Sequence, residues 1–401
     1  MSAKVLIVCD AFPPDFAPRI GNLCKYLPDK YDVTIVTVEP ISDLWPVAFE
    51  RKNFRLLRFN LLSYNGMDSI THRIADYLFS LGDRQLYRMA LKTIGNQTFD
   101  VVLCTSCYIF PLRCAQKLAA HFCAPLCIDL RDIMEQDAKP VGINKIVQFA
   151  KLRWLNQLRR NRILKCAETV TTISPWHVAT LSRVNPNTQL IYNGFDAEKF
   201  AFKPVKTDKF IVTYTGRLLD INLRDPRLFL EAVSQLCQDE TFAQNICIRW
   251  FVDAKSAEEI AQLTSDYGLD ACTEISKTIS ADLMPDILNT SSLVLVLSNK
   301  ATKNGPHGIM TTKFFEAVGC EKPVLCVRSD DDCLAATIGR TNAGLAGSNV
   351  TDVKDFITEK YNEWKSVGYT HQPVNQDEKI KFTRQAQALQ FAAVIDKAMR
   401  Q

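Results

Sequence analysis

Short runs of Val, Ile and Leu recur along the chain, and most of them do not alternate with polar residues. A strand that reads as a continuous apolar run is covered on both faces, as in a parallel sheet flanked by helices. The runs predict strands at 4–9, 32–38, 54–59, 100–105, 125–130, 169–173, 210–216, 246–252, 293–297 and 323–327, with a weaker one at 272–275.

Between these runs lie stretches whose apolar residues have helical spacing. They predict helices around 19–27, 72–94, 111–121, 144–166, 226–237, 256–266, 281–289 and 311–318. Strands that alternate with helices indicate parallel sheets joined by right-handed crossovers. The fold class is therefore α/β, built from doubly wound, Rossmann-like sheets.

The pattern of strands and helices starts afresh near residue 208. The segment before it, 193–209, is polar and contains Gly, Pro and Lys, as a domain linker does. We therefore expect a first domain at 1–195 and a second at 196–376, facing each other across a cleft. The remaining residues, 377–401, are expected to form one more amphipathic helix, over 377–400. A length of 401 residues fits two or three domains.

Composition narrows the class of protein. Hydrophobic residues make up 47% of the chain and charged residues 23%, which allows large cores and excludes disorder. A net charge of +4 is too small for a dedicated nucleic-acid binder. The 14 cysteines form no disulfide or zinc pattern, and the chain begins on a strand rather than a signal peptide. These features favour a cytoplasmic protein without a metal site.

Two loops of the first domain follow predicted strands and carry charges. In the first loop, Asp15, Arg19 and Gly21 precede or open a helix, so they are candidates for a loop that reaches into the cleft. In the second stretch, Asp129, Arg131 and Asp132 cluster at the end of a buried strand. Ligands of open α/β sheets bind at the carboxyl ends of the strands, which makes both loops candidates for chemistry. An ordinary connection and a satisfied salt-bridge cluster are the alternatives.

The loop after strand 210–216 of the second domain offers positive charge. Gly216 allows a close backbone approach, and Arg217 and Arg224 carry guanidinium groups suited to a diphosphate. Pro226 is well placed as the first residue of the next helix.

The stretch "HGIMTTKFFEAVGCEKPVL" (307–325) combines several polar groups at the start of an apolar helix. The amides and hydroxyls of Thr311 and Thr312, with the charge of Lys313, suit a phosphate. Glu316 lies one turn further on, where a carboxylate can accept hydrogen bonds from a ribose diol. The mixture fits a nucleotide. The alternative is a helix with a capping threonine and an incidental Lys–Glu pair.

Taken together, these loops resemble a glycosyltransferase of the GT-B fold, family 4 (glycosyltransferase group 1), over nearly the whole chain. The motifs that carry the resemblance are "FPPDFAPRIGNLCKYL" (12–27), "DLRD" (129–132), "TISPWH" (172–177), "IYNGFD" (191–196), "YTGRL" (214–218) and "GIMTTKFFEAVGCEKPVL" (308–325). They occur in the family's order.

The resemblance implies that the second domain binds the donor and the first binds the acceptor. The final helix would cross back to pack on the first domain. By this carry-over Glu316 holds the donor ribose and the Thr311–Thr312 amides hold the diphosphate. Arg217 contacts the diphosphate too, and Arg224 is the nearest candidate for a lysine that the family has shortly after this arginine. Lys313 is counted, with Arg217, among the catalytic candidates.

The chain departs from the family at two places. Many members have a Glu eight residues before the position of Glu316, near the donor sugar, but here Gly308 stands there, preceded by His307. The first-domain group near the anomeric carbon, often a His in relatives, is not matched cleanly. Asp132 and Arg131 are the catalytic candidates instead.

The implied reaction moves a sugar from a nucleotide-diphosphate sugar to a hydroxyl of a glycan or lipid-linked acceptor. The resemblance implies retention of the anomeric configuration and a role in bacterial surface polysaccharide synthesis. Arginines, Lys313 and helix amides can stabilise the leaving diphosphate, so no metal or other cofactor is expected. "SDDDC" (329–333) contains an Asp-x-Asp pattern, but its place after a strand suggests a helix cap.

Two other functions remain open: a GT-B-shaped sugar-nucleotide epimerase, and a catalytically silent partner subunit, which the Gly308 departure favours. The segment "KLRWLNQLRRNRILK" (151–165) has basic residues and no acidic ones, with Leu, Trp and Ile between them. This composition suits a helix on an anionic membrane surface at the inner face of the plasma membrane, with Trp154 at the interface. The alternative is a core-facing helix with a solvated basic side.

Overall fold

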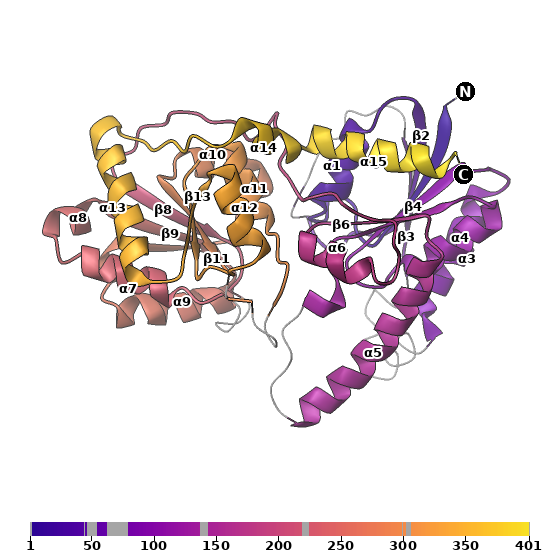
Figure 1. The fold of residues 1–401 in the computed structure, drawn as a ribbon, viewed down its shortest axis with the longest axis horizontal. Helices are drawn as coiled ribbons and strands as arrows, with labels where there is room; N and C mark the ends of the chain where they lie inside the picture. Colours follow the sequence, from indigo (N-terminus) through magenta and orange to yellow (C-terminus); the bar gives the residue numbers. More distant parts are fainter. Residues whose placement is uncertain are drawn as a thin grey trace. The chain divides into compact units, whose positions relative to one another are not determined.

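The computed structural model describes residues 2–43, 45, 54–61, 79–136, 143–218, 224–298, 300–301 and 306–400, and over 143–152 it describes the backbone alone. The chain divides into two compact units. The first unit combines Met1–Tyr192 with Arg384–Gln401, and the second unit is Asn193–Thr383. Each unit is a parallel sheet covered by helices (Figure 1).

Within the described residues, the sheet of the first unit has seven strands in the order β3-β2-β1-β4-β5-β6-β7, and every neighbouring pair is parallel. The strands are β1 (Ala3–Cys9), β2 (Tyr31–Val38), β3 (Phe54–Phe59), β4 (Val101–Ser106), β5 (Leu126–Leu130), β6 (Thr169–Thr172) and β7 (Thr188–Leu190). The helices are α1 (Pro18–Tyr26), α3 (Leu81–Ile94), α4 (Leu112–Phe122), η1 (Met134–Gln136), α5 (Ile143–Lys165), α6 (Pro175–Leu181) and α15 (Arg384–Ala398).

Both faces of this sheet are buried, as the unbroken apolar runs predict. Side chains alternate between the two faces of a strand. In β1, Leu6 and Val8 therefore join one apolar core, while Val5 and Ile7 join another on the opposite face. The second of these cores is completed by α15, which packs against α1 (Figure 1).

The part of the second unit that the structure describes has a six-stranded sheet in the order β10-β9-β8-β11-β12-β13, again with parallel neighbours. Its strands are β8 (Phe210–Thr215), β9 (Ile246–Val252), β10 (Thr273–Lys277), β11 (Leu293–Leu297), β12 (Val324–Val327) and β13 (Gly344–Gly347). Its helices are α7 (Arg227–Leu236), α8 (Glu240–Asn245), α9 (Ala254–Asp266), η2 (Asp270–Cys272), η3 (Ala281–Leu283), α10 (Met284–Asn289), α11 (Thr312–Gly319), α12 (Cys333–Thr341), α13 (Val350–Val367) and α14 (Gln376–Lys381).

The predicted α/β fold class with two doubly wound sheets is confirmed. All of the predicted strands occur within a residue or two of their expected bounds. The elements that were not predicted include the short edge strands β7 and β13 and the helices α12 and α13. The first part of the helix predicted at 72–94 lies outside the described residues, whereas its remainder is α3.

The single helix expected over 377–400 is in fact two, α14 and α15. The break comes at Phe382 and Thr383. There the carbonyl of Phe382 accepts a hydrogen bond from the backbone N–H of Phe195 at 3.0 Å, and Thr383 forms an isolated parallel bridge with Phe195. Phe382 is buried, and its ring contacts that of Phe315 at 5.0 Å. Pairing of this backbone with a distant segment interrupts the helix and places α14 in the second unit.

No helix in the described part of the chain is both long enough and apolar enough to span a membrane.

Candidate functional site

The strand order marks one place in each sheet where a ligand is expected. In the second unit the chain proceeds outward from β8 in one direction through β9 to β10, and in the other direction through β11 and β12 to β13. Ligands of doubly wound sheets bind at such a switch point, beyond the carboxyl ends of the two central strands. The loops after β8 and β11 therefore frame the candidate site, and both contain residues that the sequence analysis singled out.

Gly216 and Lys313 meet at this switch point. Gly216 directly follows β8 and has a φ of +106°, which L side chains rarely adopt. A Cβ atom on Gly216 would lie 2.5 Å from Nζ of Lys313 and 2.8 Å from its Cε. The ammonium also lies 4.5 Å from the ring centroid of Tyr214, at a cation–π distance. The positive φ favours glycine here, and the end of the lysine side chain occupies the space beside its backbone.

Lys313 is an unusual cation. Burial, and to a smaller extent the nearby charge of Arg224, lower the pKa of its ammonium to about 7, although Glu316 opposes the change. Among the described residues, no carboxylate forms a salt bridge with Lys313. The switch point therefore holds a cation that lacks a full counter-charge, which an anionic ligand would supply.

The arginines of the β8 loop add to this charge. Arg217 is exposed, and its carbonyl accepts hydrogen bonds from Tyr214 Oη at 2.8 Å and from Nη1 of Arg224. Arg224 thus folds back over the start of the loop. This places its charge close enough to Lys313 to affect the pKa of the lysine.

Helix α11 begins at the same edge of the sheet. Thr311 is its N-cap residue, with an extended backbone and without a capping hydrogen bond from its own side chain. Thr311, Thr312 and Glu316 are all partly buried. The first amides of a helix carry partial positive charge and bind anions. Cationic side chains beside such a helix start can bind a phosphate or diphosphate, and Glu316 one turn further on can accept hydrogen bonds from hydroxyl groups.

His307 and Gly308 lie just before α11. Gly308 is buried and has a φ of +63°, and its N–H donates to Oδ2 of Asp332 at 3.2 Å. Nδ1 of His307 lies 4.0 Å from the same oxygen. Sequence reasoning missed Asp332 as a member of this group because it treated the 329–333 stretch as a helix cap.

In the first unit, the residues expected in a loop that reaches into the cleft are buried and contact other parts of the same unit. Arg19 is buried, and its guanidinium forms a two-pronged ion pair with Asp129, with both N–O distances at 2.8 Å. It also donates to the carbonyls of Tyr192 at 2.7 Å and Ile191 at 2.9 Å. Gly21 is buried within α1.

Asp15, the third of the residues expected in the cleft loop, links the loop after β1 to the loop after β2 by hydrogen bonds. Its Oδ1 accepts hydrogen bonds from the backbone N–H groups of Ile41 at 3.1 Å and Ser42 at 2.8 Å, and from the Ser42 hydroxyl at 2.8 Å. Asp15 is itself buried. Asp15 thus joins the loops after β1 and β2, while Arg19 joins α1 to β5 and to the segment after β7.

Arg131 and Asp132 follow β5, at the carboxyl edge of the first sheet, and each has a protein partner. Arg131 forms an ion pair with Asp10, which raises the pKa of the guanidinium although burial opposes the change. Asp132 accepts a hydrogen bond from Gln136 Nε2 at 2.8 Å. Asp10 was missed in the sequence, although it directly follows the apolar run of β1 and could have been found by the rule that selected Arg131.

His177, which the sequence analysis quoted only as part of a motif, is fully buried at the start of α6. Its Nδ1 lies 3.1 Å from the hydroxyl of Thr172, and its Nε2 has no hydrogen-bond partner among the described residues. Burial lowers the pKa of His177 to about 4, against the opposing charges of Asp132 and Glu135. The side chain is therefore neutral at physiological pH.

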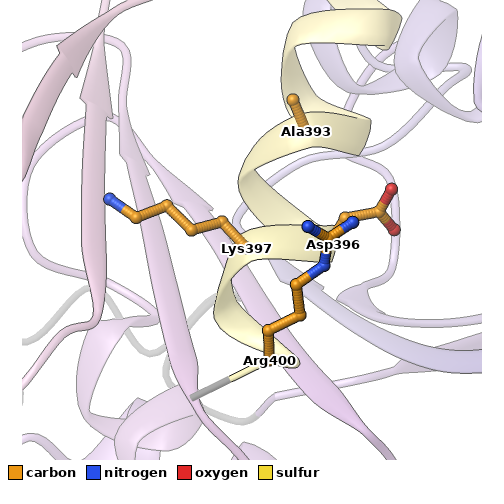
Figure 2. A pocket seen from close by; sticks show the side chains of 4 residues that line it. All are labelled: Ala393, Asp396, Lys397 and Arg400. Atoms are coloured by element: carbon orange, nitrogen blue, oxygen red, sulfur yellow. The ribbon is translucent and has the colours of Figure 1, made fainter.

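A pocket of about 350 Å³ lies elsewhere, on α15, and is lined by Ala393, Asp396, Lys397 and Arg400 (Figure 2). Asp396 already accepts hydrogen bonds from Lys30 at 2.6 Å and from the Tyr31 hydroxyl at 2.7 Å, while Lys397 extends away from it (Figure 2). This pocket contains none of the predicted site residues. Among the residues that the structure describes, no group of three or more His, Cys, Asp or Glu could hold a metal ion.

Replacing Lys313 with methionine should reveal how much the buried ammonium destabilises the folded protein, because this destabilisation depends on pH. The folded-state pKa is about 7, against an ordinary value of 10.5, so between these pH values the unfolded chain binds the additional proton. The stability of the wild type should therefore rise relative to Lys313→Met, by about 1–2 kcal/mol between pH 7 and pH 9. Urea unfolding at pH 7, 8 and 9 measures this. The exposed Lys255→Met serves as a control, and a difference that does not vary with pH would contradict the prediction.

Comparison with known proteins agrees with this architecture. The two parallel sheets, each wound around a central switch point, define the GT-B fold. Solved structures similar to this chain include a sucrose-phosphate synthase from Thermosynechococcus elongatus, with a TM-score of 0.69, 16% identity and coverage of 98% of both chains. The Anabaena protein HepE in complex with UDP-glucose gives a TM-score of 0.64 at 14% identity, covering 98% of this chain and 99% of HepE. A glycosyltransferase from Rickettsia africae gives 0.65 at 11% identity, covering 99% of both. The sequence matches no protein-family model and no curated protein.

Proposed function

We propose that the chain is a glycosyltransferase of family 4, which transfers a sugar from a nucleotide-diphosphate sugar to a hydroxyl of a glycan or lipid-linked acceptor. The observation that carries the proposal is the meeting of Lys313 with the Gly216 backbone at the switch point of the second sheet, beside the start of α11. Solved structures of similar fold support it, since one holds UDP-glucose and another is a UDP-forming trehalose-phosphate synthase.

In this proposal the second unit binds the donor. Lys313, Arg217 and Arg224 with the α11 amides bind the diphosphate, and Glu316 accepts hydrogen bonds from the ribose. Negative charge grows on the diphosphate as the sugar leaves. Donors that are already in place stabilise this charge without reorganisation, which is the largest catalytic contribution in such sites. The charge of Lys313, which Glu316 offsets only in part, suits this role.

The first unit would bind the acceptor and contribute Asp132 and Arg131 near the reacting carbon. Arg131 is held by Asp10 and Asp132 by Gln136, so both side chains have fixed orientations. Retention of the anomeric configuration and a place in bacterial surface polysaccharide synthesis rest on the resemblance of the motifs alone.

A screen of nucleotide sugars tests the proposal. UDP-, GDP- and dTDP-sugars are each added to the purified protein, and the shift in melting temperature is measured. One base should be favoured, and Glu316→Ala should reduce its shift. Incubation of the favoured nucleotide sugar without acceptor separates a transferase from an epimerase, which would convert the sugar by itself. If no nucleotide or nucleotide sugar binds by calorimetry, the proposal fails and a silent partner subunit is favoured.

Transfer should continue in EDTA. The cationic side chains and helix amides at the switch point offer the charge that a metal would otherwise supply, and all three carboxylates of 329–333 already have protein partners. The initial rate with excess EDTA should stay within about twofold of the untreated rate, a small effect next to the loss expected for a catalytic group. Complete loss of activity that Mn²⁺ restores would overturn this expectation.

A lipid-linked acceptor would place the enzyme at the inner face of the plasma membrane, and we propose that α5 makes this contact. Trp154 on α5 is 62% exposed, and the basic residues Arg162 and Lys165 near its end are exposed as well. Lys151, at the start of the basic stretch, lies among the side chains left undescribed. Such a helix binds anionic lipid through its charges and an interfacial tryptophan.

Flotation with liposomes tests the membrane contact. The protein should float with vesicles that contain phosphatidylglycerol and stay unbound with phosphatidylcholine alone. Trp154→Ala should reduce the bound fraction severalfold because the aromatic anchor is lost. The matched control is Trp176→Phe, a conservative change at a tryptophan packed against the core of the first unit. Absence of binding to either vesicle would refute the membrane role.

A further inference from the structure

Asp332 stands at a capping position but does not cap its helix. It is the N-cap residue of α12, yet its side chain makes no capping hydrogen bond. Asp330 does this work instead, accepting hydrogen bonds from the backbone N–H groups of Leu334 at 3.0 Å and Ala335 at 2.8 Å. An aspartate at this position ordinarily stabilises its own helix through its carboxylate. Since Asp330 replaces it, the carboxylate of Asp332 is available for another contact.

That contact is with the segment leading into α11. Oδ2 of Asp332 accepts the N–H of Gly308 at 3.2 Å, and it lies 4.0 Å from Nδ1 of His307. Within the part of the chain that the structure describes, Oδ1 receives only the weak thiol donor of Cys333, at 3.4 Å. The side chain of Asp332 is 26% exposed, so a ligand can reach it. One carboxylate oxygen is thus used to hold the backbone, while the other has capacity to accept a further hydrogen bond.

The loop that carries Asp332 is fixed against the loop after β11. The backbone N–H of Ser298 donates to the carbonyl oxygen of Val327 at 3.1 Å, and that of Ala301 donates to the backbone carbonyl oxygen of Asp330 at 3.0 Å. Lys300 forms an ion pair with Asp331 at 2.7 Å. These contacts join the two loops at the carboxyl ends of the neighbouring strands β11 and β12. Asp332 is therefore held in place relative to the start of α11.

The chemistry of a carboxylate at this place restricts what it can bind. Gly308 lies three residues before Thr311, the cap of α11, and has no side chain of its own. A negative charge near a diphosphate site repels a further phosphate but accepts hydrogen bonds from hydroxyl groups. Its natural ligand is the neutral, hydroxyl-rich part of a donor that is joined to the diphosphate.

We propose that Asp332 accepts a hydrogen bond from a hydroxyl of the donor sugar, and so lets the site select a nucleotide sugar over the bare nucleoside diphosphate. Residue 308 is a glycine, and the carboxylate beside it comes from the β12 loop. This inference rests on the proposed function and adds a residue that determines donor specificity.

The test compares two variants and two ligands. Asp332→Asn keeps an oxygen that can accept the Gly308 N–H but removes the charge. Its matched control is Asp331→Asn, which changes the neighbouring carboxylate that pairs with Lys300. Calorimetry gives the dissociation constants of UDP and UDP-glucose, or of the corresponding GDP or dTDP pair if the screen selects that base. Asp332→Asn should weaken the nucleotide sugar about tenfold or more and leave the nucleoside diphosphate within about twofold. Asp331→Asn should change neither.

The outcomes separate this inference from the proposed function. If Asp332→Asn binds the nucleotide sugar as tightly as the wild type, or weakens both ligands equally, Asp332 does not select the sugar. If Glu316→Ala weakens both ligands at the same time, the donor site stands and the inference alone is lost. If the wild type binds neither ligand of any base, the proposed function itself is overturned.

Discussion

Replacing Arg19 with methionine should destabilise the first unit by about 3–5 kcal/mol, since it leaves a buried carboxylate without its counter-charge. Arg19 is 4% exposed and Asp129 is 1% exposed, and the two form a two-pronged ion pair. Burial by itself would raise the pKa of Asp129. The charge and hydrogen bonds of Arg19, with hydrogen bonds from Thr171 and Thr105, outweigh burial and lower it. Urea unfolding of wild type and Arg19→Met measures the loss.

The sign of the pH dependence gives a second check on this pair. A carboxylate with a lowered pKa contributes stability above its unfolded value of 3.8, and this contribution disappears as the pH falls. In Arg19→Met the buried carboxyl takes up a proton more readily. The loss of unfolding free energy relative to the wild type should therefore shrink as the pH falls toward 4. The exposed Arg55→Met is the matched control and should stay within about 0.5 kcal/mol of the wild type. A deficit of similar size in both variants would show that the ion pair is not responsible.

Arg217→Ala and Glu316→Ala should each reduce transfer about 100-fold or more, the usual loss when a group that stabilises or positions the reacting charge is removed. The side chain of Arg217 is exposed, and its backbone carbonyl makes the contacts to Tyr214 and Arg224, so the substitution should leave the fold intact. Initial rates with the donor selected by the screen, measured as release of nucleoside diphosphate, give the effect.

Lys255→Ala, which removes an exposed lysine of α9, is the control for these two variants and should transfer at the wild-type rate. Melting curves of all three proteins establish whether they are folded. Folded Arg217→Ala or Glu316→Ala protein with near-normal turnover would remove the donor site from the second unit. Loss of turnover with nucleotide binding unchanged would instead place the residue in the chemical step.

The fold was predictable because its central strands are unbroken apolar runs. The edge strands β7 and β13 escaped prediction because their pattern is weaker, whereas the edge strands β3 and β10 were predicted. Strand β7 is only partly buried, and β13 includes Gly344, where a Cβ atom would lie 2.0 Å from the carbonyl oxygen of Val324. Helix α13 could have been predicted, since Asn349 caps it and Gly368 ends it with a φ of +87°. These two signals were present in the sequence.

Part of the candidate site could be anticipated from local signals, since Gly216 directly follows strand β8 and Lys313 lies at the start of helix α11. It was less predictable where a partner comes from a distant segment. The pairing of Arg19 with Asp129 joins residues 110 positions apart, and neither pattern nor spacing indicates it. The same holds for Asp332 and Gly308, which lie in the loops after two different strands, β12 and β11. Which distant residues pair depends on the exact topology of the fold, whereas the sequence predicts only the fold class.

The position of α15 has a consequence for biosynthesis. Phe391 and Ile395 complete an apolar core of the first unit, but they are translated only after the whole of Asn193–Thr383. While the ribosome makes the intervening residues, the nascent first unit exposes the apolar surface that this helix later covers. The second unit, by contrast, is continuous and can fold as soon as it emerges. We therefore expect the first unit, although most of it is translated first, to complete its folding last. Until α15 is made, we expect chaperones to protect its exposed apolar surface.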